Sequence, residues 1–74
     1  MANGDIHTQP YGSRWVNKVE GNSRPSNIHD TKDEAQREGR EMAIRNKVEH
    51  LIHNQDHWVE ERNSYRSDPA SRVV

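Results

Sequence analysis

The chain has 74 residues, which is enough for one domain and close to the smallest size that folds without a disulfide, a metal or a partner. It contains no cysteine, which excludes disulfides and thiolate metal sites, and only 28% of its residues are hydrophobic. The 11 basic and 12 acidic residues nearly cancel to a formal charge of −1, so the chain as a whole does not attract nucleic acid or anionic lipid over long distances.

A β-hairpin is predicted near the start of the chain, after a disordered N-terminus at residues 1–5. Residues 6–9 could form a short strand with Ile6 and Thr8 on one face, residues 10–13 read Pro-Tyr-Gly-Ser, and residues 14–20 contain two valines and a tryptophan. Proline and glycine are typical of turns, and β-branched and aromatic residues are typical of strands. The pattern therefore predicts a strand, a turn and a second strand.

The second strand has one face that suits a core. Trp15, Asn17 and Val19 share one side of a strand, because side chains alternate with a period of two. We expect the side with Trp15 and Val19 to be buried. The other side, which we expect to meet water, carries Val16, Lys18 and Glu20.

The clearest signal in the sequence is a helix that begins at Thr31 and runs to about Lys47. Residues 21–26 form a polar loop before it, and residues 27–29 read as a brief extended piece. Thr31 and Glu34 fit the T-x-x-E pattern of a capping box, in which the threonine oxygen accepts from a first-turn amide. Asn46 or Lys47 is expected to end the helix, since asparagine tolerates the left-handed conformation.

This helix has a narrow stripe of small apolar residues. They recur at helical spacing and are Ala35, Gly39, Met42 and Ala43. Glycine costs about 1 kcal/mol relative to alanine inside a helix, so Gly39 indicates close contact with a flat sheet, one that bears Trp15. Ile44 lies opposite the stripe and is expected to be exposed.

A second hairpin is predicted after the helix, with strands at residues 48–53 and 58–62 and a turn at residues 54–57. The expected fold class is therefore α+β: a small two-layer β-β-α-β-β domain, an antiparallel sheet with one helix packed on one face. The expected boundaries are a single domain at residues 6–65 and a flexible C-terminal tail at residues 66–74.

The order and spacing of several short segments resemble a known bacterial family. The segments are Trp15 with Lys18, then Glu20-Gly21-Asn22-Ser23-Arg24, Ser26 to Ala35, Ala43, Leu51-Ile52-His53, and Glu61-Arg62-Asn63-Ser64-Tyr65 followed by Asp68-Pro69. In these segments the chain resembles the bacterial family that is catalogued as domain of unknown function 2188. The resemblance implies a small module of strands around one helix, and no catalytic residues come with it. The family often has glycines where this chain has Asn54 and His57, and an apolar residue in place of Asn17.

Three histidines, His50, His53 and His57, follow one another in the second hairpin. On a helix, spacings of three and four would place their rings on one side, as a zinc or nickel site requires. On the predicted strand, His50 and His53 point to opposite faces. We therefore expect no metal site and no cofactor, and we expect His7 and His29 to be isolated surface residues.

The sequence also lacks the common catalytic signatures. It contains no G-x-S-x-G, no phosphate-binding glycine loop and no H-E-x-x-H pattern. The carboxylates Asp33 and Glu34 belong to the helix start, and Glu60 and Glu61 would face opposite sides of a strand. We expect no enzymatic activity.

The composition favours a non-enzymatic binding or scaffolding module that acts through protein contacts, including a homodimer. One helix leaves one face of the sheet bare, and a second copy would enlarge a thin core. The candidate interaction surface comprises Arg14, Lys18, Arg24, Ile44, Arg62 and Tyr65. No apolar run reaches the roughly 18 residues of a membrane span, so we expect a cytoplasmic protein with no membrane partner.

The alternative function is weak nucleic-acid binding. In such a surface, bases stack on aromatic side chains and basic residues hold the phosphates. The residues for it are Arg14, Lys18, Arg24 and Arg62, with Trp15, Trp58 and Tyr65. The net charge and the absence of a basic run make this function the less favoured one.

Overall fold

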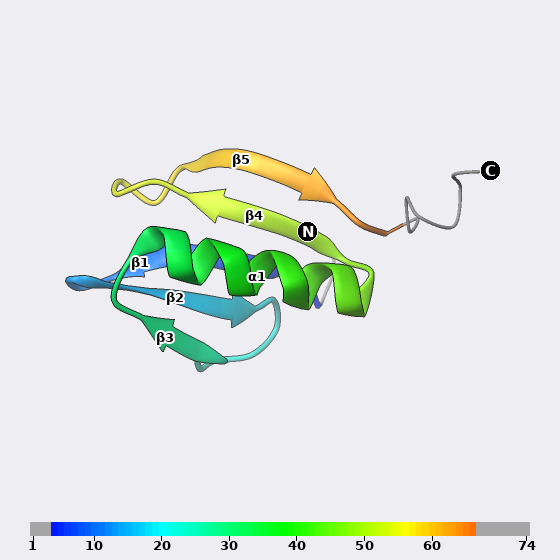
Figure 1. Cartoon of the computed structure of the whole chain (residues 1–74), viewed down its shortest axis with the longest axis horizontal. Helices are drawn as coiled ribbons and strands as arrows, with labels where there is room; N and C mark the ends of the chain where they lie inside the picture. The colour runs from blue at the N-terminus through cyan, green and yellow to red at the C-terminus, as the bar shows by residue number, and fades with distance from the viewer. Residues whose placement is uncertain (1–3, 67–74) are drawn as a thin grey trace.

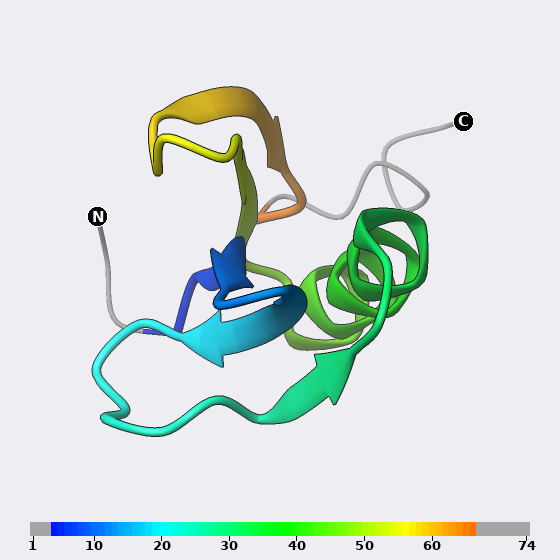
Figure 2. The same cartoon turned by 90° about the vertical axis from the view of Figure 1, so that its left-hand side faces the viewer.

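One helix lies across one face of a curved five-stranded sheet in the computed structural model, which describes residues 4–66 (Figures 1 and 2). In chain order the elements are β1 (Ile6–Tyr11), β2 (Arg14–Val19), β3 (Asn27–His29), α1 (Lys32–Asn46), β4 (Glu49–His53) and β5 (Val59–Ser64). This is the predicted α+β domain with a helix on one face. Both predicted hairpins are present, and the extended piece before the helix is a third strand.

The strands lie in the order β3-β2-β1-β4-β5. Three ladders are antiparallel, but β1 and β4 run parallel, with Ile6 beside His50 and Thr8 beside Ile52. The expectation of an all-antiparallel sheet is therefore wrong at this one ladder. The cause is α1, which returns the chain across the sheet, so that β4 begins at the same end as β1.

The predicted helix start is confirmed, and its end lies within one residue of the expected position. The Thr31 side chain accepts a hydrogen bond from the Glu34 amide at 3.2 Å. The helix ends at Asn46, and Lys47 rather than the asparagine takes the left-handed conformation, with φ 56°. Within residues 4–66 no helix is long and apolar enough to cross a membrane.

The predicted small-residue stripe is confirmed as the buried side of α1. Met42 and Ala43 pack against Ile6 on β1, and Trp15 is also buried, with 7% of its surface exposed. Around this core lie three partly buried residues: Val19, Val48 and Tyr65. Ile44 is 48% exposed on the outer side of the helix, as expected.

A buried polar cluster lies between the helix and the centre of the sheet. Asn17 donates to the Ala35 carbonyl of α1 at 2.8 Å and accepts from the Thr8 hydroxyl at 2.5 Å. Since that hydroxyl gives its hydrogen to Asn17, it accepts from Nε2 of His50 at 2.7 Å. Each of these three side chains is at most 1% exposed. The cluster thus ties β1, β2, β4 and α1 together.

Gly39 lies directly over this cluster. A Cβ atom at its position would be 2.4 Å from Oδ1 of Asn17, 2.6 Å from Oγ1 of Thr8 and 2.7 Å from Nε2 of His50. The close contact with the sheet predicted for Gly39 is confirmed, and the nearest atoms belong to polar side chains. The helix can reach these side chains only because this residue has no side chain.

The burial of the sheet differs from expectation at Val16. Val16 is on the face away from the helix, where we expected contact with water, yet it is fully buried. Gln9 and Ile28 flank it in the register. Trp58 lies in the turn before β5 and is 72% exposed, so it is not part of the core.

Asp5 and Arg66, which lie in the two expected termini, contact the domain. Asp5, assigned to a disordered N-terminus, is fully buried and accepts from the Glu49 amide at 3.1 Å. Arg66, assigned to the flexible tail, donates to the same carboxylate at 3.0 Å. The rest of both expected termini, residues 1–3 and 67–74, lies outside the described residues.

We predict that Gly39→Ala destabilises the protein, although alanine is the better helix former by about 1 kcal/mol. The added methyl group must displace hydrogen-bonded side chains, and such overpacking gives an expected net loss of about 2 kcal/mol. Urea unfolding monitored by circular dichroism measures it. Arg37→Ala, on the exposed side of the same helix, is the control and should change the free energy of unfolding by less than about 0.5 kcal/mol.

Candidate functional site

The face of the sheet that α1 does not cover is the candidate site, and we call it the open face. One row of positions crosses it: Ile28, Val16 and Gln9 are neighbours on β3, β2 and β1, and His53 and Val59 are neighbours on β4 and β5. The two ends of this row are apolar and exposed, Ile28 by 49% and Val59 by 44%. Among residues 4–66 no helix covers this face (Figure 2).

Aromatic side chains add to the exposed apolar area at one end of the sheet. Tyr11 ends β1 on the open face and is 58% exposed, and Trp58 lies in the nearby turn between β4 and β5. At the other end an open cavity of about 400 Å³ is lined by His7, Lys18 and Glu20, among others. The open face therefore combines exposed apolar residues with a polar hollow.

Two histidines that are far apart in sequence meet on this face. Nδ1 of His7, on β1, is 2.8 Å from Nε2 of His53, on β4. The other nitrogen of His7 is 2.5 Å from Oε1 of Glu20, and the other nitrogen of His53 is 3.2 Å from the carbonyl oxygen of His57. The expectation that His7 is isolated is wrong, and no local pattern could reveal a contact across 46 residues.

The predicted geometry of His50, His53 and His57 is confirmed. His50 points to the helix side and His53 to the open face, since they are three positions apart on one strand. Within the described part of the chain, no group of three or more His, Cys, Asp or Glu side chains is arranged to hold a metal ion. His29, expected to be isolated, bonds through Nε2 to Glu38 at 2.6 Å.

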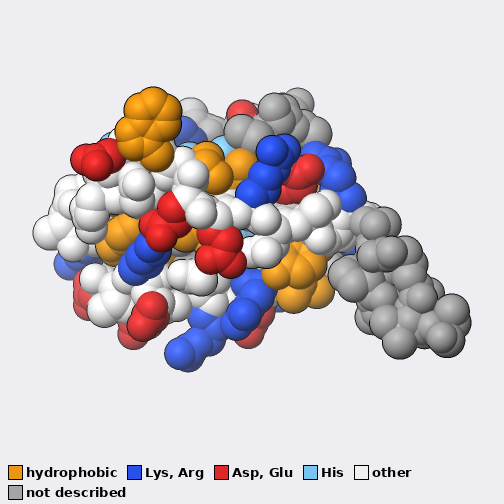
Figure 3. Space-filling model, turned by 90° about the horizontal axis from the view of Figure 1, so that it is seen from above, with side chains coloured by type: hydrophobic (Ala, Val, Ile, Leu, Met, Phe, Trp, Pro, Cys, Tyr) orange, Lys and Arg blue, Asp and Glu red, His pale blue; other side chains and the backbone are white. Residues whose placement is uncertain are grey.

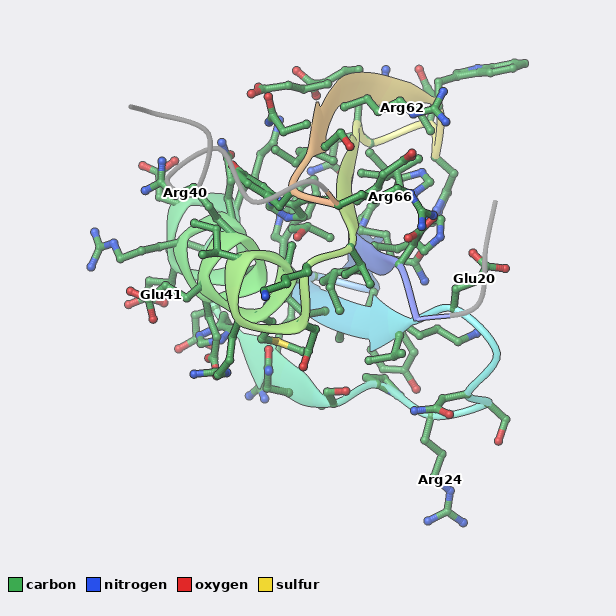
Figure 4. The ribbon with its side chains drawn as sticks, turned by 90° about the vertical axis from the view of Figure 1, so that its right-hand side faces the viewer. Glu20, Arg24, Arg40, Glu41, Arg62 and Arg66 are labelled. Carbon is green, nitrogen blue, oxygen red and sulfur yellow. The ribbon has the colours of Figure 1, made fainter. Side chains whose placement is uncertain are left out.

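The six residues of the predicted interaction surface do not form one patch. Arg14, Lys18 and Arg62 share the open face by register. Arg24 extends from the loop between β2 and β3, at the opposite edge of the sheet from Arg62 (Figure 4). Two of the six lie on the helix side, Ile44 on the exposed side of α1 and Tyr65 against the core.

Carboxylates neutralise most of the basic groups on the open face. Arg62 and Arg66 both donate to Glu49, at 3.0 and 3.1 Å, and these hydrogen bonds, Arg62 first, lower the pKa of Glu49. Arg14 lies 3.4 Å from Asp30. Viewed from the β5 edge, acidic and basic side chains are interspersed rather than gathered by sign (Figure 3). Trp15, one of the expected stacking residues, is buried.

The fold and this face define a small α+β domain with one helix-covered and one open sheet face. A family model described as "uncharacterized protein conserved in bacteria (DUF2188)" matches residues 6–65, and the chain belongs to this family. The resemblance seen in the sequence is thus confirmed, and the family is one of unknown function. No curated protein and no solved structure matches the chain.

We predict that the protein loses stability as the pH falls through the titration of His50. Burial lowers the pKa of this ring from 6.5 to about 4, so the unfolded chain binds the proton more readily than the folded protein does. The stabilisation is complete above the unfolded pKa of 6.5 and is lost as the pH falls towards 4. The total is about 3 kcal/mol.

Urea unfolding measured across this pH range tests the prediction. His53 contributes in the same direction, because burial lowers its pKa too. His50→Gln keeps a donor for Thr8 but cannot titrate, so its stability should depend less on pH. A wild-type curve that is flat between these two pH values would contradict the assignment.

Proposed function

We propose that the protein is a non-enzymatic binding module that uses its open face to contact protein, and that the first partner is a second copy of the same chain. The observation that carries this proposal is the row of exposed apolar side chains on the open face. Ile28 and Val59 stand at its two ends, and Tyr11 lies beside it.

The spacing of this row suits an interface. Its two apolar ends are on the two edge strands and are separated by four strand-to-strand spacings, about 19 Å in total. Contact surfaces between proteins combine exposed apolar side chains with polar residues between and around them. Aromatic residues such as Tyr11 and Trp58 are enriched in such surfaces.

A second copy is the favoured partner because the core of one copy is small. The helix side buries only a few large apolar side chains, and a chain of this length gains stability when it covers further apolar surface. Face-to-face packing is favoured over edge pairing. β3 has three residues, and β5 carries Glu60, Glu61 and Arg62 next to an irregularity in its ladder, features that discourage strand addition.

Nucleic-acid binding is the alternative, and one observation supports it. Arg14, Lys18 and Arg62 share the open face. Two of them already have carboxylate partners, which a phosphate would have to displace. This function requires retention on heparin that falls steeply with salt, whereas self-association does not.

A matched pair of isoleucines tests the proposal. Ile28 and Ile44 are almost equally exposed, at 49% and 48%, but Ile28 is on the open face and Ile44 is on the outer side of α1. We predict that Ile28→Ser weakens self-association about tenfold, which corresponds to about 1.4 kcal/mol of lost contact energy. Ile44→Ser should leave it unchanged. Sedimentation equilibrium over a range of concentrations measures both.

Three outcomes decide between the functions. A wild-type protein that stays monomeric at high micromolar concentration contradicts self-association. A loss of association in Ile44→Ser but not in Ile28→Ser would move the interface to the helix. Salt-sensitive heparin binding that Lys18→Ala and Arg62→Ala abolish, without any dimer, supports the nucleic-acid alternative instead.

A further inference from the structure

The contact between His7 and His53 brings two ring nitrogens together on the open face, and each ring has a second partner at its outer nitrogen. Nδ1 of His7 and Nε2 of His53 are 2.8 Å apart, and the ring centroids are 5.1 Å apart with an angle of 31° between the planes. One of the two nitrogens would need a hydrogen for this to be a hydrogen bond. The partners of the outer nitrogens decide whether it has one.

Both outer nitrogens face groups that can only accept. Nε2 of His7 is 2.5 Å from a carboxylate oxygen of Glu20, and Nδ1 of His53 is 3.2 Å from the carbonyl oxygen of His57. Each outer nitrogen therefore carries the hydrogen. When both imidazoles are neutral, each has only one N–H group, so both inner nitrogens present lone pairs to each other. When the pair holds one more proton, that proton forms a hydrogen bond between the inner nitrogens.

From this arrangement we infer that the His7–His53 pair is a two-imidazole binding site for a divalent transition metal, with the preference of Cu²⁺ or Ni²⁺. Two lone pairs this close together can share a cation, either a proton or a metal ion. Metal-binding histidines characteristically donate their second N–H to a carboxylate or to a backbone carbonyl, which fixes the tautomer and the ring orientation. Glu20 and the His57 carbonyl do this for the two rings.

The distance between the inner nitrogens can be compared with the distances between ligands in metal sites. With metal–nitrogen bonds of about 2.0–2.1 Å, two adjacent ligands of a square arrangement lie about 2.9 Å apart, and two ligands of a tetrahedron about 3.3 Å. The observed 2.8 Å is closer to the value for the square arrangement, and it is also the length of a hydrogen bond between the two rings. Tetragonal coordination by nitrogen and oxygen is typical of Cu²⁺ and Ni²⁺, and zinc prefers the tetrahedron.

The remaining coordination positions open towards solvent. His7 lines the cavity of about 400 Å³ next to Lys18 and Glu20, so water can reach the metal from that side. Within residues 4–66 no third His, Cys, Asp or Glu side chain completes a cluster with these two. The site is therefore expected to bind metal exchangeably and more weakly than a closed structural site. This inference does not depend on self-association.

Titration of the full chain with Cu²⁺, followed by calorimetry and electron paramagnetic resonance, tests the inference. We expect one ion per chain with two nitrogen ligands in the copper spectrum. His7→Gln and His53→Gln should each weaken binding at least tenfold. His7→Gln should still fold, because a glutamine amide can donate to the lone pair of His53. Glu20→Ala should weaken binding about tenfold by loosening the orientation of His7.

Two matched controls separate this site from adventitious binding. His29→Gln removes an imidazole that is also bonded to a glutamate, Glu38, but has no second imidazole beside it. His57→Asn removes a ring but keeps the carbonyl that orients His53, at a position where φ is 67° and asparagine is tolerated. Both variants should bind copper as the wild type does.

Several results would overturn the inference. One is that His29→Gln weakens binding as much as His7→Gln does, since this would show adventitious copper only. Another is a copper spectrum without two nitrogen ligands. A third is no binding at all, with nitrogen-15 spectra showing that the pair takes up a proton and remains metal-free.

Discussion

The close approach of α1 to the sheet at Gly39 is the constraint on which the rest of the structure depends. The helix lies against the polar side chains of Thr8, Asn17 and His50, where larger domains usually place apolar residues. The hydrogen bonds of that cluster form a chain with one direction. His50 donates to Thr8, Thr8 donates to Asn17, and Asn17 donates to the Ala35 carbonyl. The cluster therefore fixes the position of the helix as well as its distance from the sheet.

This arrangement keeps His50 neutral and leaves its Nδ1 without a partner in the described structure. A buried acceptor without a donor costs about 1–3 kcal/mol, which the hydrogen bonds of the cluster offset. A chain with few large apolar residues thus holds its two layers together partly by directed hydrogen bonds. Such bonds tolerate little change in geometry, which is why a single methyl group at Gly39 matters.

A single helix also explains the character of the open face. It covers only one side of the sheet, so the apolar ends of the row at Ile28 and Val59 and the imidazole pair of His7 and His53 are left on the other. The same parallel ladder serves both sides: it places His50 beneath the helix and brings His53 beside β1. The proposed contact surface and the proposed metal site are therefore two consequences of one topology.

The sequence alone determined the features that depend on neighbours a few residues apart. The cap at Thr31, the small-residue stripe of α1, both hairpins and the opposite directions of His50 and His53 follow from local chemistry and from periods of 3.6 and 2. Only the tertiary structure decided the parallel pairing of β1 with β4, the burial of Val16 and the meeting of His7 with His53. These features depend on how strands that are distant in the sequence are ordered and aligned. The residues next to a position in the sequence do not indicate which strand will lie beside it in the sheet.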